Sequence, residues 1–69
     1  MTVDTNGNLF VCDPHGMKIH IFEPSSSYVG NINIPERVAN CTFGGENKSD
    51  LYITASTSLY RLKTLTRGL

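Results

Sequence analysis

The amino-acid sequence predicts an all-β fold, and three observations support that prediction. Short apolar runs with the periodicity of strands recur along the 69 residues, turn-forming residues separate them, and no segment has a convincing helical face. The nearest approach to a helix is the spacing of Leu62, Leu65 and Leu69, which Gly68 and two threonines weaken. We therefore expect residues 63–69 to form an extended or disordered tail.

Four short strands are expected in the first half of the chain. The expected strands are residues 2–4, 9–12, 17–22 and 28–34. An Asn-Gly turn at positions 6–7 joins the first two as an antiparallel hairpin, because glycine adopts positive φ without strain. The third strand alternates apolar and polar side chains, with Met17, Ile19 and Ile21 on one face, as a half-buried strand does.

Three more strands are expected after Pro35, which lacks a backbone N–H and ends the fourth strand. These strands are residues 38–43, 51–55 and 58–62. A polar loop that begins with Gly44 and Gly45 separates the first two. Because no helix follows the paired glycines, a tight turn at the strand end is expected there, not a phosphate-binding loop.

An internal repeat relates the two groups of strands. Leu9-Phe10-Val11 aligns with Leu51-Tyr52-Ile53 at an offset of 42 residues, and each copy follows a turn that contains Asn and Gly. A period of about 40 to 45 residues with four strands per unit is typical of β-propeller blades. Residues 1–62 are therefore predicted to form a partial β-propeller of about one and two-thirds blades. Its parts are one blade over residues 1–34 and three strands of the next over residues 38–62. A small open β-sheet without a ring is the alternative.

Composition excludes several classes of partner. Six Lys plus Arg balance six Asp plus Glu without a basic cluster, so neither nucleic acid nor an anionic membrane surface is an expected partner. No apolar run approaches the ~20 residues that span a bilayer, and the first residues lack the pattern of a signal peptide. Two cysteines without metal-ligand spacing fit a reducing compartment. We expect a soluble, cytoplasmic protein.

Four segments carry a family pattern in order and spacing. They are MTVDTNGNLFVCD, GMKIHIFEP, IPERVANCTFGG and LYITASTSLYRL. From Met1 to about Leu62 the sequence resembles the C-terminal end of the senescence marker protein 30/gluconolactonase family of six-bladed propellers. The most diagnostic part is ANCTFGG followed by LYITASTSLYR, since the turn NGNL recurs in unrelated propellers.

The resemblance implies a hydrolase of sugar lactones, a class of carboxylic ester hydrolase, that depends on one divalent cation, calcium or zinc. The family's metal ligands would all lie upstream of Met1, so no metal ligand and no catalytic residue is expected in this chain. The family also completes its last blade with a strand from the protein's N-terminus, which agrees with three strands in the second unit. We therefore expect the C-terminal part of a longer lactonase, inactive by itself and completed by missing blades or by self-association.

A non-catalytic β-propeller that serves as a binding module is the alternative function, because the same turns and repeat occur in propellers of both kinds. The sequence upstream of Met1 would distinguish the two. In the enzyme, a Pro-Asp-Gly turn would stand just before Met1, and a metal-binding Glu near the true N-terminus.

Asn40 is the one candidate for lining a substrate pocket. It lies in the strand expected to run closest to the central channel in the second blade. The alternative role is that of a buried amide bonded to the backbone of a neighbouring blade. Its neighbour Cys41 points to the other face of the strand and is expected to be a small buried side chain, as is Cys12.

Other polar residues are expected to be structural. Asp4 and Asp13 stand beside tight turns, where Asx side chains bond to backbone groups, so turn formation is favoured over metal binding. His15 falls in a turn and His20 at a polar strand position, so both are expected at the surface. The sequence supports no Ser-His-Asp or Cys-His arrangement.

Overall fold

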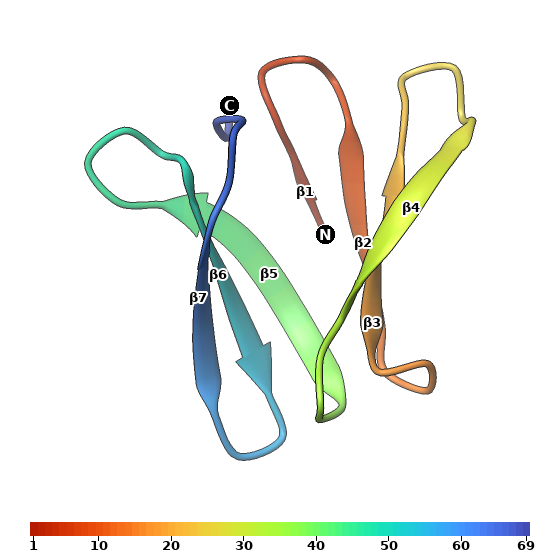
Figure 1. Ribbon diagram of the computed structural model, residues 1–69, viewed down its shortest axis with the longest axis vertical. Helices are drawn as coiled ribbons and strands as arrows, with labels where there is room; N and C mark the ends of the chain where they lie inside the picture. Colours follow the sequence, from red (N-terminus) through yellow and green to blue (C-terminus); the bar gives the residue numbers. More distant parts are fainter.

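The computed structural model describes residues 1–69 and contains seven β-strands and no helix (Figure 1). The strands are β1 (Thr2–Val3), β2 (Leu9–Asp13), β3 (Lys18–Phe22), β4 (Tyr28–Asn33), β5 (Val38–Gly44), β6 (Asp50–Ala55) and β7 (Leu59–Lys63). The prediction of an all-β fold is confirmed. None of the chain forms a helix with the length and apolar character needed to cross a membrane.

The strands form two antiparallel sheets in which each strand pairs with the next along the chain. The first sheet has the order β1-β2-β3-β4 and the second the order β5-β6-β7. Figure 1 shows the two sheets side by side, and β5 contacts both β1 and β2. A four-stranded meander beside a three-stranded one is consistent with blades of a β-propeller.

Apolar side chains from both sheets meet between them. In the first sheet Phe10 lies opposite Ile21 and Cys12 opposite Ile19, so these residues share one face. The Phe10 ring packs edge to face against Phe43 of the second sheet, with ring centroids 5.2 Å apart. The buried core consists of Phe10, Ile19, Ile34, Val38, Cys41, Leu51 and Ile53. One face of each sheet is thus covered by the other sheet.

Backbone angles at two turns test the strand bounds expected from the sequence. Gly7 has a φ of 84°, the positive value that the expected Asn-Gly hairpin requires. Met17 has a φ of 53° in the β2–β3 turn, and its side chain is 45% exposed. Its expected place in the third strand is wrong, because Met17 has a left-handed backbone in the turn and β3 begins at Lys18.

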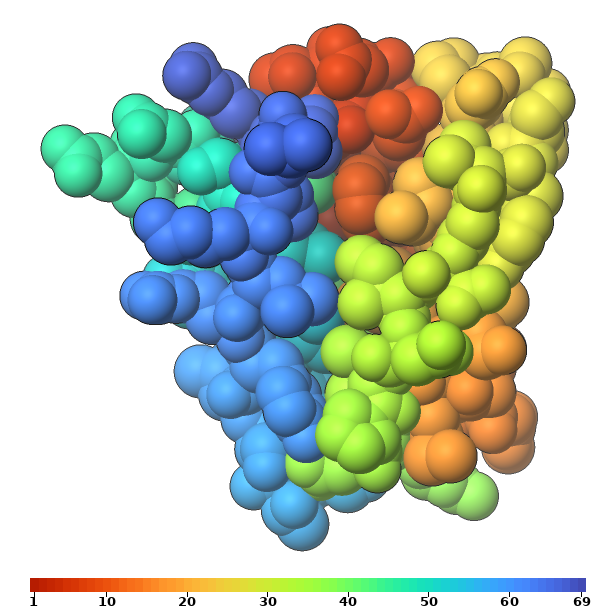
Figure 2. Space-filling view, in the orientation of Figure 1, coloured from red at the N-terminus to blue at the C-terminus, as the bar shows by residue number.

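The C-terminal segment 64–69 bends at residues 65–66 and bonds to both sheets, whereas Lys63, expected in the tail, belongs to β7. Thr5 N donates to Arg67 O at 2.7 Å in the first unit, and Gly68 N donates to Lys48 O at 2.8 Å in the second. Gly68 also forms a β-bridge with Asp4. Figure 2 shows these last residues, in blue, against the red N-terminal residues. The segment therefore fixes the β1–β2 turn to the loop that precedes β6.

Gly68→Ala is expected to destabilise the chain, because a Cβ at this position would lie 2.3 Å from Phe43 Cβ. Overpacking of this kind costs about 1–3 kcal/mol. Gly30→Ala is the matched control in β4, where a Cβ would meet no atom within 4 Å. Urea unfolding of both variants measures the difference. Equal stability of the two would show that Phe43 moves aside without cost.

Candidate functional site

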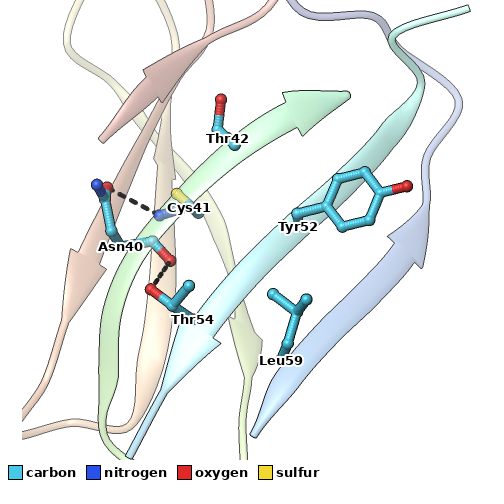
Figure 3. Close-up of a pocket in the computed structure, with 6 residues that line it drawn as sticks. All are labelled: Asn40, Cys41, Thr42, Tyr52, Thr54 and Leu59. Atoms are coloured by element: carbon cyan, nitrogen blue, oxygen red, sulfur yellow. Dashed lines mark hydrogen bonds between the residues drawn. The ribbon is translucent and has the colours of Figure 1, made fainter. Parts of the chain in front are cut away.

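An open hollow of about 330 Å³ lies on the face of the second sheet that points away from the core. It is lined by Asn40, Cys41, Thr42, Tyr52, Thr54 and Leu59 (Figure 3). Strand alternation places the side chains of Asn40 and Thr42 outward and that of Cys41 inward. The side chains offer an amide, two aliphatic hydroxyls and a phenol, all neutral hydrogen-bonding groups. Because the lining contains no carboxylate or imidazole, the hollow provides binding groups and no general base.

Asn40 occupies an irregular position in its strand. The pairing of β5 with β6 shifts register between Val38 and Asn40, and such a bulge changes the direction of a side chain. Asn40 is exposed, and its Oδ1 accepts hydrogen bonds from Cys41 N at 2.9 Å and from the Met1 ammonium at 2.8 Å. Thr54 Oγ1 donates to its carbonyl oxygen at 3.4 Å. In this chain the Asn40 amide thus stands at the surface beside the hollow.

Asp4 is 1% exposed and holds the β1–β2 turn together. Its Oδ1 accepts from the backbone N–H groups of Asn6 and Asn8, and its Oδ2 accepts from Asn8 Nδ2 and from Thr66 Oγ1 at 2.9 Å. Burial raises the pKa of Asp4, but the hydrogen bonds from Asn8, Thr66 and Asn6 lower it more, so the net shift is downward. The three contacts from Asn6 and Asn8 fit the expected role in a turn, and the one from Thr66 adds a tie to the C-terminal segment.

Asp13, His20 and Tyr28 form a hydrogen-bonded row on the outer face of the first sheet. His20 Nε2 lies 2.9 Å from Asp13 Oδ2, and its Nδ1 lies 2.9 Å from the Tyr28 hydroxyl. Asp13 Oδ1 also accepts from Gly16 N, as expected for a turn. The hydrogen bond from His20 is the main cause that lowers the pKa of Asp13. The sequence placed His20 at the surface but gave no sign of this row, whose members come from three strands.

Glu36 is a structural residue that the sequence did not single out. It lies in the connection between the sheets, and its Oε1 accepts from Thr57 N at 2.9 Å and Thr57 Oγ1 at 2.7 Å. Its Oε2 accepts from the Tyr60 hydroxyl. Hydrogen bonds from Thr57 and Tyr60 lower the pKa of Glu36 to about 2. The carboxylate therefore fastens the connection to the β6–β7 hairpin.

We expect the stability contributed by Glu36 to be lost at low pH. The folded pKa is depressed from 4.5 to about 2, so the contribution is complete above pH 4.5 and disappears as the pH falls through about 2. Urea midpoints measured across this window should fall more steeply in the parent chain than in Glu36→Gln. Glu46→Gln, in the exposed loop between β5 and β6, is the control and should follow the parent. If the urea midpoint of Glu36→Gln falls with pH as steeply as that of the parent chain, the Glu36 carboxylate does not provide this pH-dependent stability.

The chain brings together no group of three or more His, Cys, Asp or Glu side chains that could hold a metal ion. The oxygens of Asp4 already accept four hydrogen bonds, and Asp13 is engaged by His20 and Gly16. A hard cation such as calcium needs six to eight converging oxygen ligands, and structural zinc needs four ligands. The residues of this chain therefore do not fit a complete cation site.

Known proteins resemble this chain over most of its length. The pattern of the SMP-30/Gluconolactonase/LRE-like region matches residues 1–57. A gluconolactonase from Zymomonas mobilis subsp. mobilis is 40% identical over 99% of the chain and 19% of its own length. A regucalcin from Danio rerio is 38% identical over 81% of the chain and 20% of its own length. The chain thus spans about a fifth of the length of these relatives.

Proposed function

The chain belongs to the SMP-30/gluconolactonase/LRE-like family, and from this membership we propose that it forms part of the β-propeller of a gluconolactonase-like enzyme that hydrolyses sugar lactones. The observation that carries the proposal is the family match over residues 1–57, which extends from β1 into the β6–β7 turn. The chain's own contribution would be blade scaffold at the C-terminal end of a six-bladed ring.

The uncovered surfaces of the two sheets support a longer propeller. Strand β7 of the three-stranded sheet is paired with β6 only, which leaves an edge for the fourth strand of that blade. The outer face of the first sheet presents Val3, Leu9 and Val11 in an open hollow of about 470 Å³. In a propeller, neighbouring blades cover such faces, and repeat units need several neighbours to bury them.

Lactone hydrolysis adds water across the ring ester. The water oxygen bonds to the carbonyl carbon, the ring C–O bond breaks, and the released oxygen takes a proton to give a hydroxy acid. A divalent cation, calcium or zinc, would supply Lewis-acid polarisation when bound. Since the residues of this chain do not form a cation site, we propose that the ligands come from other blades and assign no catalytic step to this chain.

Asn40 is the residue of this chain that we propose to contact the sugar. Its exposed amide stands beside a hollow lined by hydroxyl groups, which suits a polyhydroxylated, uncharged ligand. In a lactonase that contains the chain, Asn40→Ala should lower kcat/KM about 2- to 10-fold, the loss of one neutral hydrogen bond. Asn33→Ala, an exposed amide of β4 on the other sheet, is the control. No change in Asn40→Ala would exclude Asn40 from the pocket.

The activity itself is tested by measuring acid release from gluconolactone with calcium, with zinc and with a chelator. The isolated 69-residue chain is expected to give no cation-dependent rate, and a longer protein that contains it is expected to give one. Cation-dependent hydrolysis by the isolated chain would refute our placement of the ligands elsewhere. An inactive longer protein would favour the non-catalytic binding propeller.

A further inference from the structure

The two cysteines of the chain lie on different sheets and face one another across the core. Cys12 belongs to β2 and Cys41 to β5, and the two strands pack against each other. The Sγ atoms of Cys12 and Cys41 are 3.3 Å apart, although the residues are separated by 29 positions in sequence. A disulfide has an S–S distance of about 2.05 Å, so bond formation requires the sulfurs to approach by only about 1.2 Å.

The two thiols differ in their access to solvent. Cys41 is 4% exposed, and burial together with the hydrogen bond from Cys12 raises the pKa of its thiol to about 12. Cys12 is half-buried. Thiol–disulfide exchange begins with attack by an accessible thiolate. Cys12 is therefore the thiol that a dissolved oxidant meets first, and Cys41 is placed to react second.

We propose that Cys12 and Cys41 are a redox-sensitive pair that a small-molecule disulfide of the glutathione class converts into an intramolecular disulfide between the two sheets. The Cys12 thiolate attacks one sulfur of the oxidant, forms a mixed disulfide and releases one small thiolate. Cys41 loses its proton to solvent, attacks the Cys12 sulfur and releases the second small thiolate. One S–S bond of the oxidant is broken and one forms in the protein. The two cysteines are oxidised and the oxidant is reduced to two thiols.

The cross-link would fix β2 to β5 across the interface between the sheets. Closing the loop between residues 12 and 41 removes conformations from the unfolded chain and so favours the folded state. Neither cysteine has a role in the proposed lactone hydrolysis, so this inference stands independently of the proposed function.

The test compares native and unfolded chain. The reduced 69-residue chain is equilibrated with oxidised and reduced glutathione in buffer and in concentrated urea, its free thiols are alkylated, and its mass is measured. In buffer the expected product is a monomer about 2 Da lighter than the reduced chain, with no alkyl groups and with residues 12 and 41 linked. Its equilibrium constant of formation is expected to be at least about tenfold larger in buffer than in urea, because only the folded state holds the sulfurs together. Its Tm should rise by on the order of 10 °C.

Two variants separate the steps. Cys41→Ser should hold a stable mixed disulfide at Cys12, and Cys12→Ser should remain unmodified in buffer. If Cys41→Ser does not fold, the proposal is tested by the Cys12→Ser variant and by the equilibrium constants of the parent chain in buffer and in urea. The proposal is overturned by glutathione retained on Cys12 of the parent chain, by a disulfide-linked dimer, or by equal equilibrium constants in buffer and urea.

Discussion

Leu51→Ala is expected to lower the free energy of unfolding of the chain by about 2–5 kcal/mol. Leu51 is 0% exposed in the central strand of the second sheet, where it lies opposite Phe43 of β5 and Leu62 of β7. The substitution removes apolar contacts and leaves a cavity. Because β6 is hydrogen-bonded to β5 on one side and to β7 on the other, its backbone cannot shift to fill that cavity. Domains are stable by only about 0.05–0.15 kcal/mol per residue, so this loss would unfold a large fraction of the molecules.

Leu59→Ala makes the same chemical change on the neighbouring strand β7, where the side chain is 66% exposed. Its expected cost is below about 0.5 kcal/mol. Urea unfolding followed by far-UV circular dichroism gives both values. Similar losses for the two variants would mean that the interface between the sheets does not carry the stability of the chain.

Asp4→Ala is expected to cost about 1–3 kcal/mol, because it leaves partly buried donors around the turn without their acceptor. Asn6 N, Asn8 N and Thr66 Oγ1 all donate to this carboxylate. The loss would release the C-terminal segment from the first sheet as well as loosen the turn. Hydrogen exchange should therefore increase at Leu69, whose N–H donates to Val3 O in the first sheet.

Asp4→Asn keeps an acceptor for the turn but presents a donor to Asn8 Nδ2, so an intermediate loss is expected. Asp13→Ala is the second comparison, since that carboxylate is 35% exposed and its loss should cost less.

The stability that Asp4 contributes should also depend on pH. The folded pKa of Asp4 is below its ordinary value of 3.8, so this contribution is complete above pH 3.8 and is lost as the pH falls through the lowered folded pKa. An Asp4→Ala variant as stable as Asp13→Ala would contradict this account.

Local pattern was enough to predict the strands and several polar roles. Alternation placed Ile19 and Ile21 on the inner face, and the Asn-Gly pair predicted the positive φ of Gly7. The burial of Cys41 followed from its parity opposite Asn40. These features depend on a residue and its near neighbours, which is the range over which strand periodicity carries information.

Contacts between distant segments could not be predicted in the same way. Thr66 reaches Asp4 from 62 positions away, and Glu36 reaches Thr57 from 21 positions away. Each depends on how the sheets pack, which no single strand pattern specifies. The candidate site has the same limit. Alternation could place the Asn40 side chain on a face of its strand, but the hollow beside it also depends on Tyr52 and Leu59 from two other strands.

The order of the strands has a consequence for how fast the molecule assembles. Within each sheet, every strand pairs with the next along the chain, so each hairpin can close within a short stretch of chain. Isolated hairpins form in about 1–10 μs, whereas contacts that close long loops are slower. The slow step should then be the docking of β2 on β5. Substitutions of Phe10 in that interface should slow refolding, and those at the exposed β6–β7 turn should mainly speed unfolding.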